Sequence, residues 1–265
     1  MRDTWRDRSI LITGGAGHIG AKLAQQIVAS DGRVALLDRQ ATALESVARE
    51  IKQMASRDDA VLTFETDLLN ERQTREACGD VADHFGTLDG LVHNAAFVGT
   101  SGLPGWTVPL EEQSAETWRS CLEVNLTVPF YVTQALLQPL RQSGSASVLM
   151  IGSIYGMSGP DHRLYEGTQM GFNPAAYGAS KGGLLQLTRY LATTLAPKIR
   201  VNCLSLGGLF RSQPAAFVDR YVDRTPLRRM GTEEDVVGPA MFLLAPDSAY
   251  ITGQNLVVDG GWTAW

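Results

Sequence analysis

Tyr177 and Lys181 are the residues whose types and spacing best suit proton transfer, and they lie in the stretch PAAYGASKGG. On a helix, residues four positions apart lie on one face, one turn from each other. An ammonium group at that distance favours the phenolate and so lowers the pKa of a phenol from about 10. The pair therefore predicts an acid/base that takes or gives a proton while a hydride moves to or from carbon. The alternative is an ordinary helix that carries one unrelated tyrosine and one lysine.

Two other polar residues fit the same chemistry. Ser153, in the stretch LMIGSIYG, ends an apolar run and could hydrogen-bond the oxygen of the same alcohol or carbonyl. Asn125, in EVNLTVPF, lies in a helical stretch although asparagine is a poor helix former. A buried asparagine that interrupts a helix could hold a water molecule, here one that relays protons from Lys181.

A glycine-rich turn near the start of the chain predicts dinucleotide binding. Gly14, Gly17 and Gly20 lie between an apolar strand and a helical pattern, and a second strand ends at Asp38. Glycines let the backbone approach a pyrophosphate, which the free N–H groups of the helix then bind. The Asp38 carboxylate can accept hydrogen bonds from a ribose and disfavours a 2′-phosphate, so we expect NAD in preference to NADP. Arg39 follows directly and could soften that preference, and the alternative is a plain glycine turn.

Two later strand ends support the same interpretation. Residues 88–96, LDGLVHNAA, end in small side chains, which leave room for a ligand beside the sheet. Asp67 follows a third strand and could accept the amino group of adenine. The alternative role for Asp67 is to cap the helix that starts at Glu71.

The elements that must position these residues alternate along the chain. Short, nearly continuous apolar runs are typical of strands buried on both faces, and alternation with helices predicts a doubly wound parallel α/β sheet of the Rossmann type. The expected strands are 9–13, 33–38, 61–65, 90–93, 147–151, 199–204 and 255–258. The expected helices are 18–30, 41–54, 71–84, 115–142, 176–196, 213–223 and 233–244. We interpret residues 97–113 as a loop and the whole chain, 1–265, as a single domain with about seven strands.

Composition excludes several classes of protein. The chain has 265 residues and a net charge of −5, which gives no electrostatic basis for binding nucleic acid or an anionic membrane. No apolar run approaches the roughly 20 residues of a membrane span, and the N-terminus shows no export signal. The three cysteines have no paired spacing, so we expect no disulfide, no metal site and a cytoplasmic location.

Over nearly its whole length the chain resembles the single-domain branch of the short-chain dehydrogenase/reductase family. The resemblance rests on residues 13–20, Asp67, 93–96 and the chemical motifs above, together with the stretches RVNCLSLG, residues 200–207, and ITGQNLVVDGG, residues 251–261. It implies a homotetramer in which the helical segments 115–142 and 176–196 form a four-helix interface. The catalytic residues that it implies are Asn125, Ser153, Tyr177 and Lys181, with Tyr177 as acid/base. The cofactor-binding residues that we predict are Gly14, Gly17, His18, Ile19, Asp38, Arg39, Asp67, Leu68, Asn94, Ala95, Ala96, Tyr177, Lys181, Gly207 and Leu209.

Four features depart from the family pattern. His18 stands where this branch usually has its middle glycine, Leu206 stands where a proline usually precedes Gly207, and Arg211 stands where a small hydroxyl residue often touches the pyrophosphate. The segment between Ser153 and Tyr177 is longer than usual. The extra residues, 157–173, must lie beside the site because both their ends do, and we refer to them as the insertion.

The insertion guides the choice of substrate. It resembles that of sugar-modifying members, and the chain is also similar to gluconate-type dehydrogenases. The polarity of the insertion suits a polyhydroxylated substrate better than an acyl chain or a steroid. Arg163 and Arg211 could bind a carboxylate, phosphate or sulfonate by paired hydrogen bonds, although either could be a solvated surface charge. His162 could also be a substrate ligand or a surface residue. The predicted substrate residues are Ser153, His162, Arg163, Tyr165 and Arg211.

We therefore predict an NAD-dependent oxidoreductase for a secondary alcohol or hemiacetal of a sugar or an acidic sugar. One alternative is an NAD(P)H-dependent 3-oxoacyl thioester reductase, which Asp38 disfavours because reductive synthesis usually draws on NADPH. A second is a catalytically silent dinucleotide sensor, which would not need Tyr177, Lys181 and Ser153.

Overall fold

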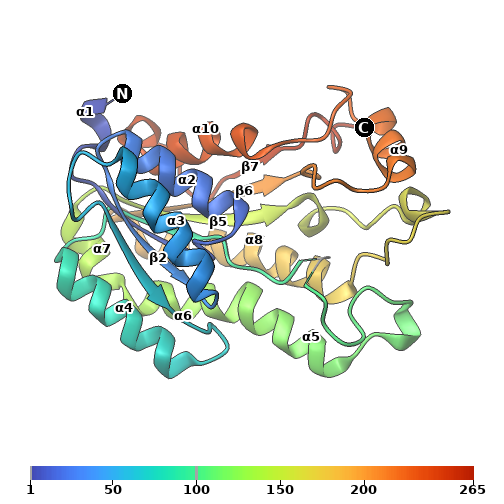
Figure 1. The fold of residues 1–265 in the computed structure, drawn as a ribbon, viewed down its shortest axis with the longest axis horizontal. Coiled ribbons are helices and arrows are strands. Elements are labelled where there is room, and N and C mark those ends of the chain that lie inside the picture. The colour runs from blue at the N-terminus through green and yellow to red at the C-terminus, as the bar shows by residue number, and fades with distance from the viewer. Residues whose placement is uncertain (1, 99–100) are drawn as a thin grey trace.

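The computed structural model describes residues 2–98 and 101–265 and contains a seven-stranded parallel sheet (Figure 1). The strand order is β3-β2-β1-β4-β5-β6-β7, which places the switch in winding direction between β1 and β4. All six neighbouring pairs run parallel, as the predicted α/β class requires. The strands are β1 (Ser9–Thr13), β2 (Arg33–Asp38), β3 (Val61–Glu65), β4 (Gly90–His93), β5 (Ala146–Ser153), β6 (Ile199–Leu206) and β7 (Asn255–Val258).

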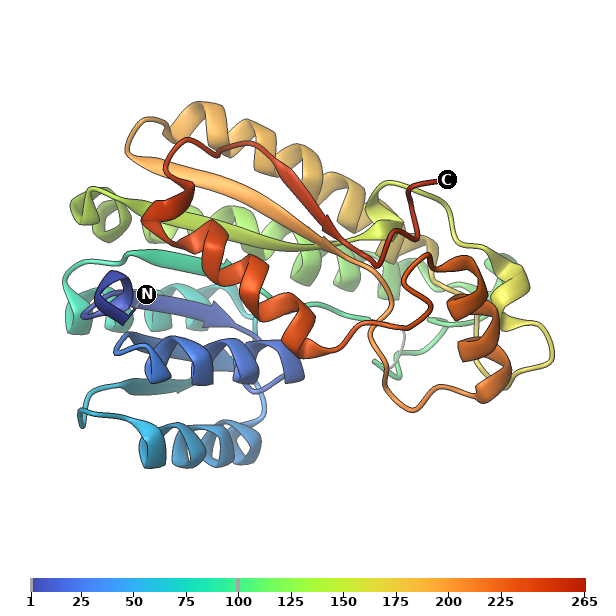
Figure 2. The same ribbon diagram turned by 90° about the horizontal axis from the view of Figure 1, so that it is seen from above.

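Helices cover both faces of this sheet (Figures 1 and 2). One hydrophobic core lies between the sheet and α2, α3 and α10, and a second lies between the sheet and α4, α6 and α8. Apolar strands such as β1 and β5 are buried along their full length because each contributes to both cores. The helices are α1 (Arg2–Trp5), α2 (His18–Ala29), α3 (Ala41–Met54), α4 (Glu71–Phe85), α5 (Ala115–Leu122), α6 (Val128–Ala135), α7 (Leu137–Ser143), α8 (Ala175–Leu195), α9 (Ala215–Arg224) and α10 (Glu233–Leu244).

The predicted strands are confirmed, but the prediction of one helix over residues 115–142 is wrong. The structure divides this segment into α5, a π-helical turn (Glu123–Thr127), α6 and α7. The π turn contains Asn125, and α6 begins with Pro129 near its first position. Single π-helical turns within α-helices are often found at functional sites. Leu136, with φ −101° and ψ 9°, separates α6 from α7.

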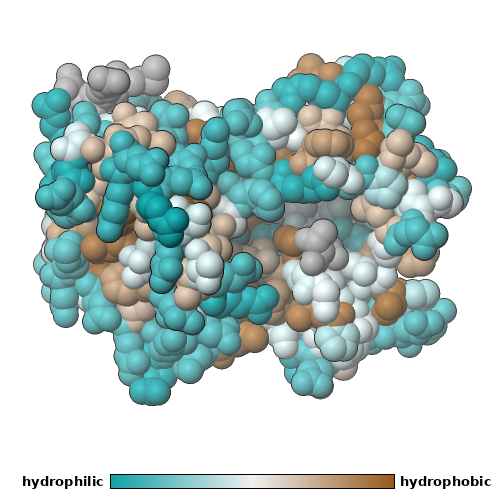
Figure 3. All heavy atoms as spheres, in the orientation of Figure 1, coloured by the Kyte–Doolittle hydropathy of each residue, from teal (hydrophilic) through white to brown (hydrophobic). Residues whose placement is uncertain are grey.

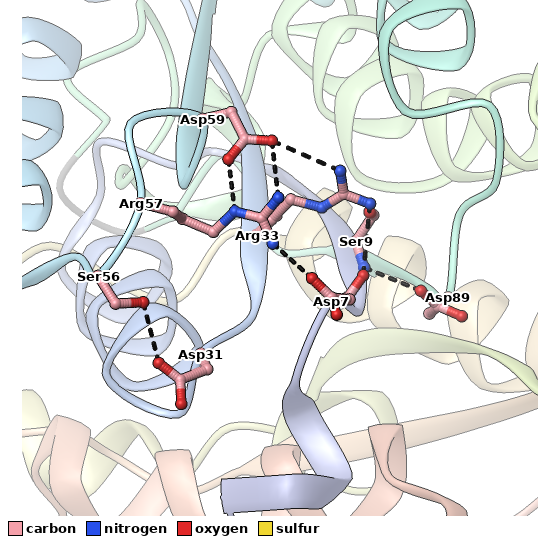
Figure 4. Close-up of polar contacts among 8 residues, drawn as sticks. All are labelled: Asp7, Ser9, Asp31, Arg33, Ser56, Arg57, Asp59 and Asp89. Carbon is pink, nitrogen blue, oxygen red and sulfur yellow. Dashed lines mark hydrogen bonds and ion pairs between the residues drawn. The ribbon is translucent and has the colours of Figure 1, made fainter.

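The amino ends of the strands are fixed by a group of ion pairs and hydrogen bonds (Figure 4). The Arg57 guanidinium pairs with Asp7 and Asp59, and the Arg33 guanidinium lies 3.6 Å from Asp59. Asp89 accepts the backbone N–H of Ser9 at 2.9 Å. These contacts tie the segment before β1 to the ends of β2, β3 and β4, which lie opposite the predicted catalytic residues.

The carboxyl ends of the strands carry a third, smaller hydrophobic core. It joins the insertion to α9 and to the C-terminal segment, and in Figure 1 these parts gather at the end to which the β5 and β6 arrows point. In Figure 3 the surface is indented between the helix-covered sheet, on the left, and this lobe, on the right. The members of this core are Ile154, Leu164, Tyr165, Phe217, Tyr221, Met230 and Trp262.

Two features were sought within residues 2–98 and 101–265: helices that could cross a membrane and clusters of metal-ligand side chains. No helix in these ranges is long and apolar enough to cross a membrane. Nor do three or more His, Cys, Asp or Glu side chains of the described chain come together in a group that could hold a metal ion.

Candidate active site

Helix α8 and strand β5 bring together three of the four predicted catalytic side chains. Tyr177 and Lys181 lie one turn apart on α8, and the Lys181 Nζ is 5.7 Å from the centre of the Tyr177 ring. The Lys181 ammonium is buried and donates a 2.7 Å hydrogen bond to the carbonyl of Ile151 in β5. Ser153, the last residue of β5, hydrogen-bonds the Tyr177 phenol. The predicted juxtaposition of phenol, ammonium and hydroxyl is therefore present.

The expected effect of Lys181 on the Tyr177 pKa is corrected by the structure. In the protein alone, burial raises the pKa of Tyr177, and the hydrogen bond from Ser153 opposes that rise. Burial also lowers the pKa of Lys181 to about 8. Desolvation is the largest cause of both pKa shifts, because each charged form loses its hydration in this site.

The buried ammonium predicts a pH dependence of stability that Lys181→Met abolishes. The folded-state pKa of Lys181 is about 8, below the ordinary 10.5, so between these values the unfolded chain binds more protons. Stability of the wild type relative to Lys181→Met therefore rises by about 3 kcal/mol as pH increases through that window. Urea unfolding at the two ends of the window measures the difference, with the exposed Lys198→Met as control. If the stability difference between the wild type and Lys181→Met did not change with pH, this result would contradict the lowered pKa of Lys181 in the folded protein.

Asn125 is engaged with neighbouring protein groups. Its Oδ1 accepts the N–H of Phe97 at 2.7 Å, and its Nδ2 donates to the carbonyl of Phe97 at 3.2 Å. The same Nδ2 donates to the Ser180 hydroxyl at 3.1 Å, which in turn donates to the carbonyl of Tyr177 at 2.8 Å. Asn125 thus links the loop after β4 to the helix that carries Tyr177, and its role in a proton relay stays a prediction.

The glycine turn has the geometry that an approaching pyrophosphate requires. Gly14 has a φ of +65°, and a Cβ there would lie 2.8 Å from the Cα of Ala95. Helix α2 begins after Gly17 with no side-chain cap and no acidic residue in its first turn. Its first N–H groups therefore have no side-chain acceptor, which favours an anion. His18 and Ile19 are the first residues of this helix, and the His18 side chain is exposed.

Asp38 and Arg39 flank this turn at the end of β2. The two oxygens of Asp38 accept the backbone N–H groups of Ala16 and Gln40, both at 3.1 Å. The Arg39 guanidinium lies 5.9 Å from the centre of the Phe97 ring. A carboxylate and a guanidinium therefore border the place where the ribose of a dinucleotide would lie.

The other predicted cofactor residues lie at the same edge of the sheet. Asn94 follows β4 and donates to the carbonyls of Thr13 and Gly14 at 3.2 and 2.9 Å, which fixes the glycine turn. Asp67 is exposed and does not cap α4, because Asn70 does so. The remaining predicted residues at this edge are Leu68 after β3, Ala95 and Ala96 after β4, and Gly207 and Leu209 after β6.

The loop after β6 is held by a residue that the sequence analysis did not single out. The Tyr221 hydroxyl, on α9, accepts the N–H of Gly208 at 2.6 Å. The N–H of Gly207 donates to the carbonyl of Val258 at 2.9 Å. These contacts fix the loop although Leu206 replaces the usual proline. The glycine cradle, the open N-terminus of α2 and the polar groups at the end of β2 together fit a nicotinamide dinucleotide.

The predicted substrate residues in and near the insertion differ in their surroundings. Arg163 is exposed and forms hydrogen bonds of 2.8 and 2.7 Å with Asp161, while Arg211 pairs with Glu233. His162 packs edge-on against Phe172 at 5.0 Å.

Tyr165, the remaining predicted substrate residue outside the catalytic set, packs against Phe217 with ring centres 5.3 Å apart. It is buried and interacts with the hydroxyl of Tyr155. Tyr155 was not predicted as a site residue, and its position two residues after Ser153 is the signal that could have identified it.

Comparisons with known proteins agree with this geometry. A family model described as enoyl-(acyl carrier protein) reductase matches residues 14–263. A probable galactose dehydrogenase of Rhizobium meliloti is 31% identical over 264 residues, which cover 97% of this chain and 95% of that protein. Galactitol 2-dehydrogenase (L-tagatose-forming) of Cereibacter sphaeroides is 30% identical, and the alignment covers 96% of this chain and 94% of that protein.

A solved structure extends the comparison to the cofactor site. A short-chain dehydrogenase from Leptospira borgpetersenii with bound NAD+ is 32% identical and superposes with a TM-score of 0.84. The superposition covers 99% of this chain and 95% of that one. With the matched family model and the phenol–ammonium pair at the edge of a seven-stranded parallel sheet, these likenesses show that the chain belongs to the short-chain dehydrogenase/reductase family, the oxidoreductases that act on CH–OH groups.

Proposed function

We propose that the protein is an NAD-dependent dehydrogenase that oxidises a secondary alcohol or hemiacetal of a sugar or polyol. The observation that carries the proposal is the contact of Tyr177 with Ser153 and its proximity to Lys181, next to a glycine cradle that fits a dinucleotide. The names of the galactose and galactitol dehydrogenases support the choice of a polyhydroxylated substrate.

The residues of the site have distinct roles in this proposal. A bound nicotinamide dinucleotide supplies the hydride acceptor for oxidation and the donor for reduction. Ser153 would hydrogen-bond the substrate oxygen, and Tyr177, once ionised to the phenolate, would take the hydroxyl proton as the hydride leaves the same carbinol carbon. Lys181 holds a positive charge beside Tyr177 and would hydrogen-bond the ribose of a bound nicotinamide. Asn125 positions α8 through Ser180.

The cofactor preference follows from the charge at the end of β2. The Asp38 carboxylate accepts hydrogen bonds from a ribose with free hydroxyls and repels a 2′-phosphate. Solved structures of relatives hold NAD+ in one case and NADP in another, so the proposed preference rests on the charge of Asp38. The proposed cofactor-binding set is the one given in the sequence analysis.

We also propose that the protein forms a homotetramer in the cytoplasm. The helices α5, α6 and α8 carry exposed aromatic side chains at Trp118, Phe130 and Tyr190, which suit an interface between copies of the chain. The three cysteines are free and buried, which suits a reducing compartment.

Turnover assays test the proposal against its alternatives. The purified protein is incubated with NAD+ or NADP+ and with galactitol, D-galactose or D-gluconate, and reduced nicotinamide is followed by absorbance. We expect oxidation of at least one neutral polyol or sugar with NAD+. Reduction of acetoacetyl-coenzyme A by NADPH, without turnover of any sugar, would instead indicate a thioester reductase. Tight NAD+ binding with no turnover of any compound would indicate a dinucleotide sensor.

A further inference from the structure

The insertion and the loop after β4 touch each other close to the start of α8. Gly171 of the insertion packs so tightly on Thr107 that a Cβ at position 171 would lie 1.9 Å from the Thr107 carbonyl oxygen. Real Cβ atoms do not approach other heavy atoms to within 3.0 Å, and the backbone of Gly171 lies outside the left-handed region. The glycine is therefore required by the contact between the two segments and not by its own backbone conformation.

A hydrogen bond joins the same loop to the first turn of α8. The Gln113 Oε1 accepts the backbone N–H of Ala175, the first residue of α8, at 3.1 Å. The Gln113 Nε2 donates to the carbonyl of Val108 at 3.2 Å, so both ends of this amide are held. Pro174, before the helix, supplies no side-chain cap, and Gln113 provides an acceptor that this turn otherwise lacks. The loop thus holds the turn that carries Tyr177.

An apolar cluster next to this contact packs on the catalytic ring. Trp106 directly precedes Thr107, is buried, and donates its indole N–H to the carbonyl of Val98 at 2.7 Å. The Tyr177 ring packs against the cluster to which Trp106 belongs. The buried members of this cluster, which we call the Trp106 cluster, are Phe97, Trp106, Cys121, Val124 and Ala176. A shift of Thr107 would therefore move a wall of the site that lies against Tyr177.

The loop after β4 keeps water from one side of the Tyr177 ring without bringing a charge near it. Burial is the largest cause of the raised pKa of Tyr177. The titratable groups that interact electrostatically with this tyrosine are Cys121, Tyr155, Tyr165 and Lys181, and none of them belongs to the loop. Cys121 is itself uncharged, because burial raises the pKa of its thiol. Trp106 therefore acts on Tyr177 through packing and the exclusion of water, and not through charge.

We propose that the contact between Gly171 and Thr107 fastens the insertion to the loop after β4 and so holds the Trp106 cluster against Tyr177. Gly171 and Trp106 are then positioning residues: neither reacts, but together they fix the phenol ring and keep water from it. Because a displacement of about 1 Å can lower a rate about a hundredfold, a contact this close to the acid/base affects turnover. The proposal deepens the proposed dehydrogenase function and rests on it.

Alanine variants of two glycines in the insertion test the contact. Gly171→Ala must push the two segments apart, whereas a Cβ at Gly159 would meet nothing within 4 Å, so Gly159→Ala is the matched control. We expect Gly171→Ala to speed amide hydrogen exchange at least about tenfold in residues 101–113, which belong to the other segment. The kcat should fall at least about tenfold, while the KM for NAD+ changes less than about twofold. Gly159→Ala should match the wild type in both measurements. Unaltered exchange of residues 101–113 in Gly171→Ala would refute the fastening.

Two variants of Trp106 test the action on Tyr177. Trp106→Leu leaves space that water can enter, and hydration favours the phenolate. The pH at which the oxidation rate reaches half its maximum should therefore fall by about one unit. Trp106→Phe keeps an aromatic ring and should keep this midpoint close to that of the wild type. A loss of stability alone would not move the midpoint, and an unchanged midpoint in Trp106→Leu would overturn the role of the cluster.

Ultraviolet absorbance provides a readout that needs no turnover. The difference between each protein and its Tyr177→Phe counterpart reports the ionisation of Tyr177 during a pH titration. This ionisation should occur at lower pH in Trp106→Leu than in the wild type, and the same titration in both proteins would count against the proposal. If Trp106→Leu shifts the titration although the wild type oxidises no alcohol, the dehydrogenase function is refuted and the positioning of Tyr177 stands.

Discussion

Replacement of Tyr177 by phenylalanine lowers kcat about a thousandfold, the contribution expected of a positioned acid/base. The change removes one oxygen and leaves the ring, so the packing of α8 against β5 is kept. Ser153 and Lys181 remain, and Lys181 still donates to the carbonyl of Ile151 at 2.7 Å. Substrate and dinucleotide therefore still bind, but the hydroxyl proton has no acceptor. Steady-state kinetics with NAD+ and the best substrate of the panel measure the loss.

Two accompanying measurements separate lost chemistry from lost structure. NAD+ affinity, measured by fluorescence titration, should change less than about threefold in Tyr177→Phe, and Tyr250→Phe, at an exposed position before β7, should keep full activity. The oxidation rate of the wild type should rise with pH as Tyr177 ionises, because burial raises the pKa of that phenol. The variant should lack this rise. A Tyr177→Phe enzyme that kept more than about a tenth of wild-type kcat would remove the phenol from the reaction.

Features that depend on local sequence were predicted well. The strand boundaries follow from apolar runs that are buried on both faces, and the range predicted for α3, residues 41–54, is the range observed. The close approach of Tyr177 and Lys181 follows from helical geometry alone, since residues four apart must share a face. The glycine turn was likewise predicted from the spacing of its glycines. The structure agrees, since Gly14 adopts a positive φ and lies against Ala95.

Features that depend on contacts made only in the folded chain were not predicted. The sequence marked Arg163 as a possible ligand for an acid, but Asp161, two residues away, binds it in the folded chain. Arg211 similarly meets Glu233 only because α10 starts beside the loop after β6. The rise in the pKa of Tyr177 depends on how deeply the folded protein buries the phenol, which helical spacing does not reveal.

The variant Asp38→Asn is expected to reverse much of the preference for NAD+ over NADP+. Asp38→Asn keeps an oxygen that can accept the N–H of Ala16 or Gln40, which the Asp38 carboxylate binds at 3.1 Å, and removes the charge. A 2′-phosphate beside the carboxylate suffers like-charge repulsion, and Arg39 is the nearby cation that could pair with the phosphate once that repulsion is gone. The ratio of kcat/KM for NADP+ to that for NAD+ should rise about a hundredfold, equivalent to about 3 kcal/mol.

The added variant Arg39→Ala identifies the source of this gain. In the Asp38→Asn background it should lower kcat/KM for NADP+ about tenfold and leave that for NAD+ nearly unchanged, because only the phosphate uses the guanidinium. Raised salt should reduce the same NADP+ gain, since the pair is near the surface. The exposed change Asp83→Ala, on α4, should leave the ratio as in the wild type. An Asp38→Asn enzyme with an unaltered ratio would show that the backbone contacts of Asp38, and not its charge, set the choice between the two dinucleotides.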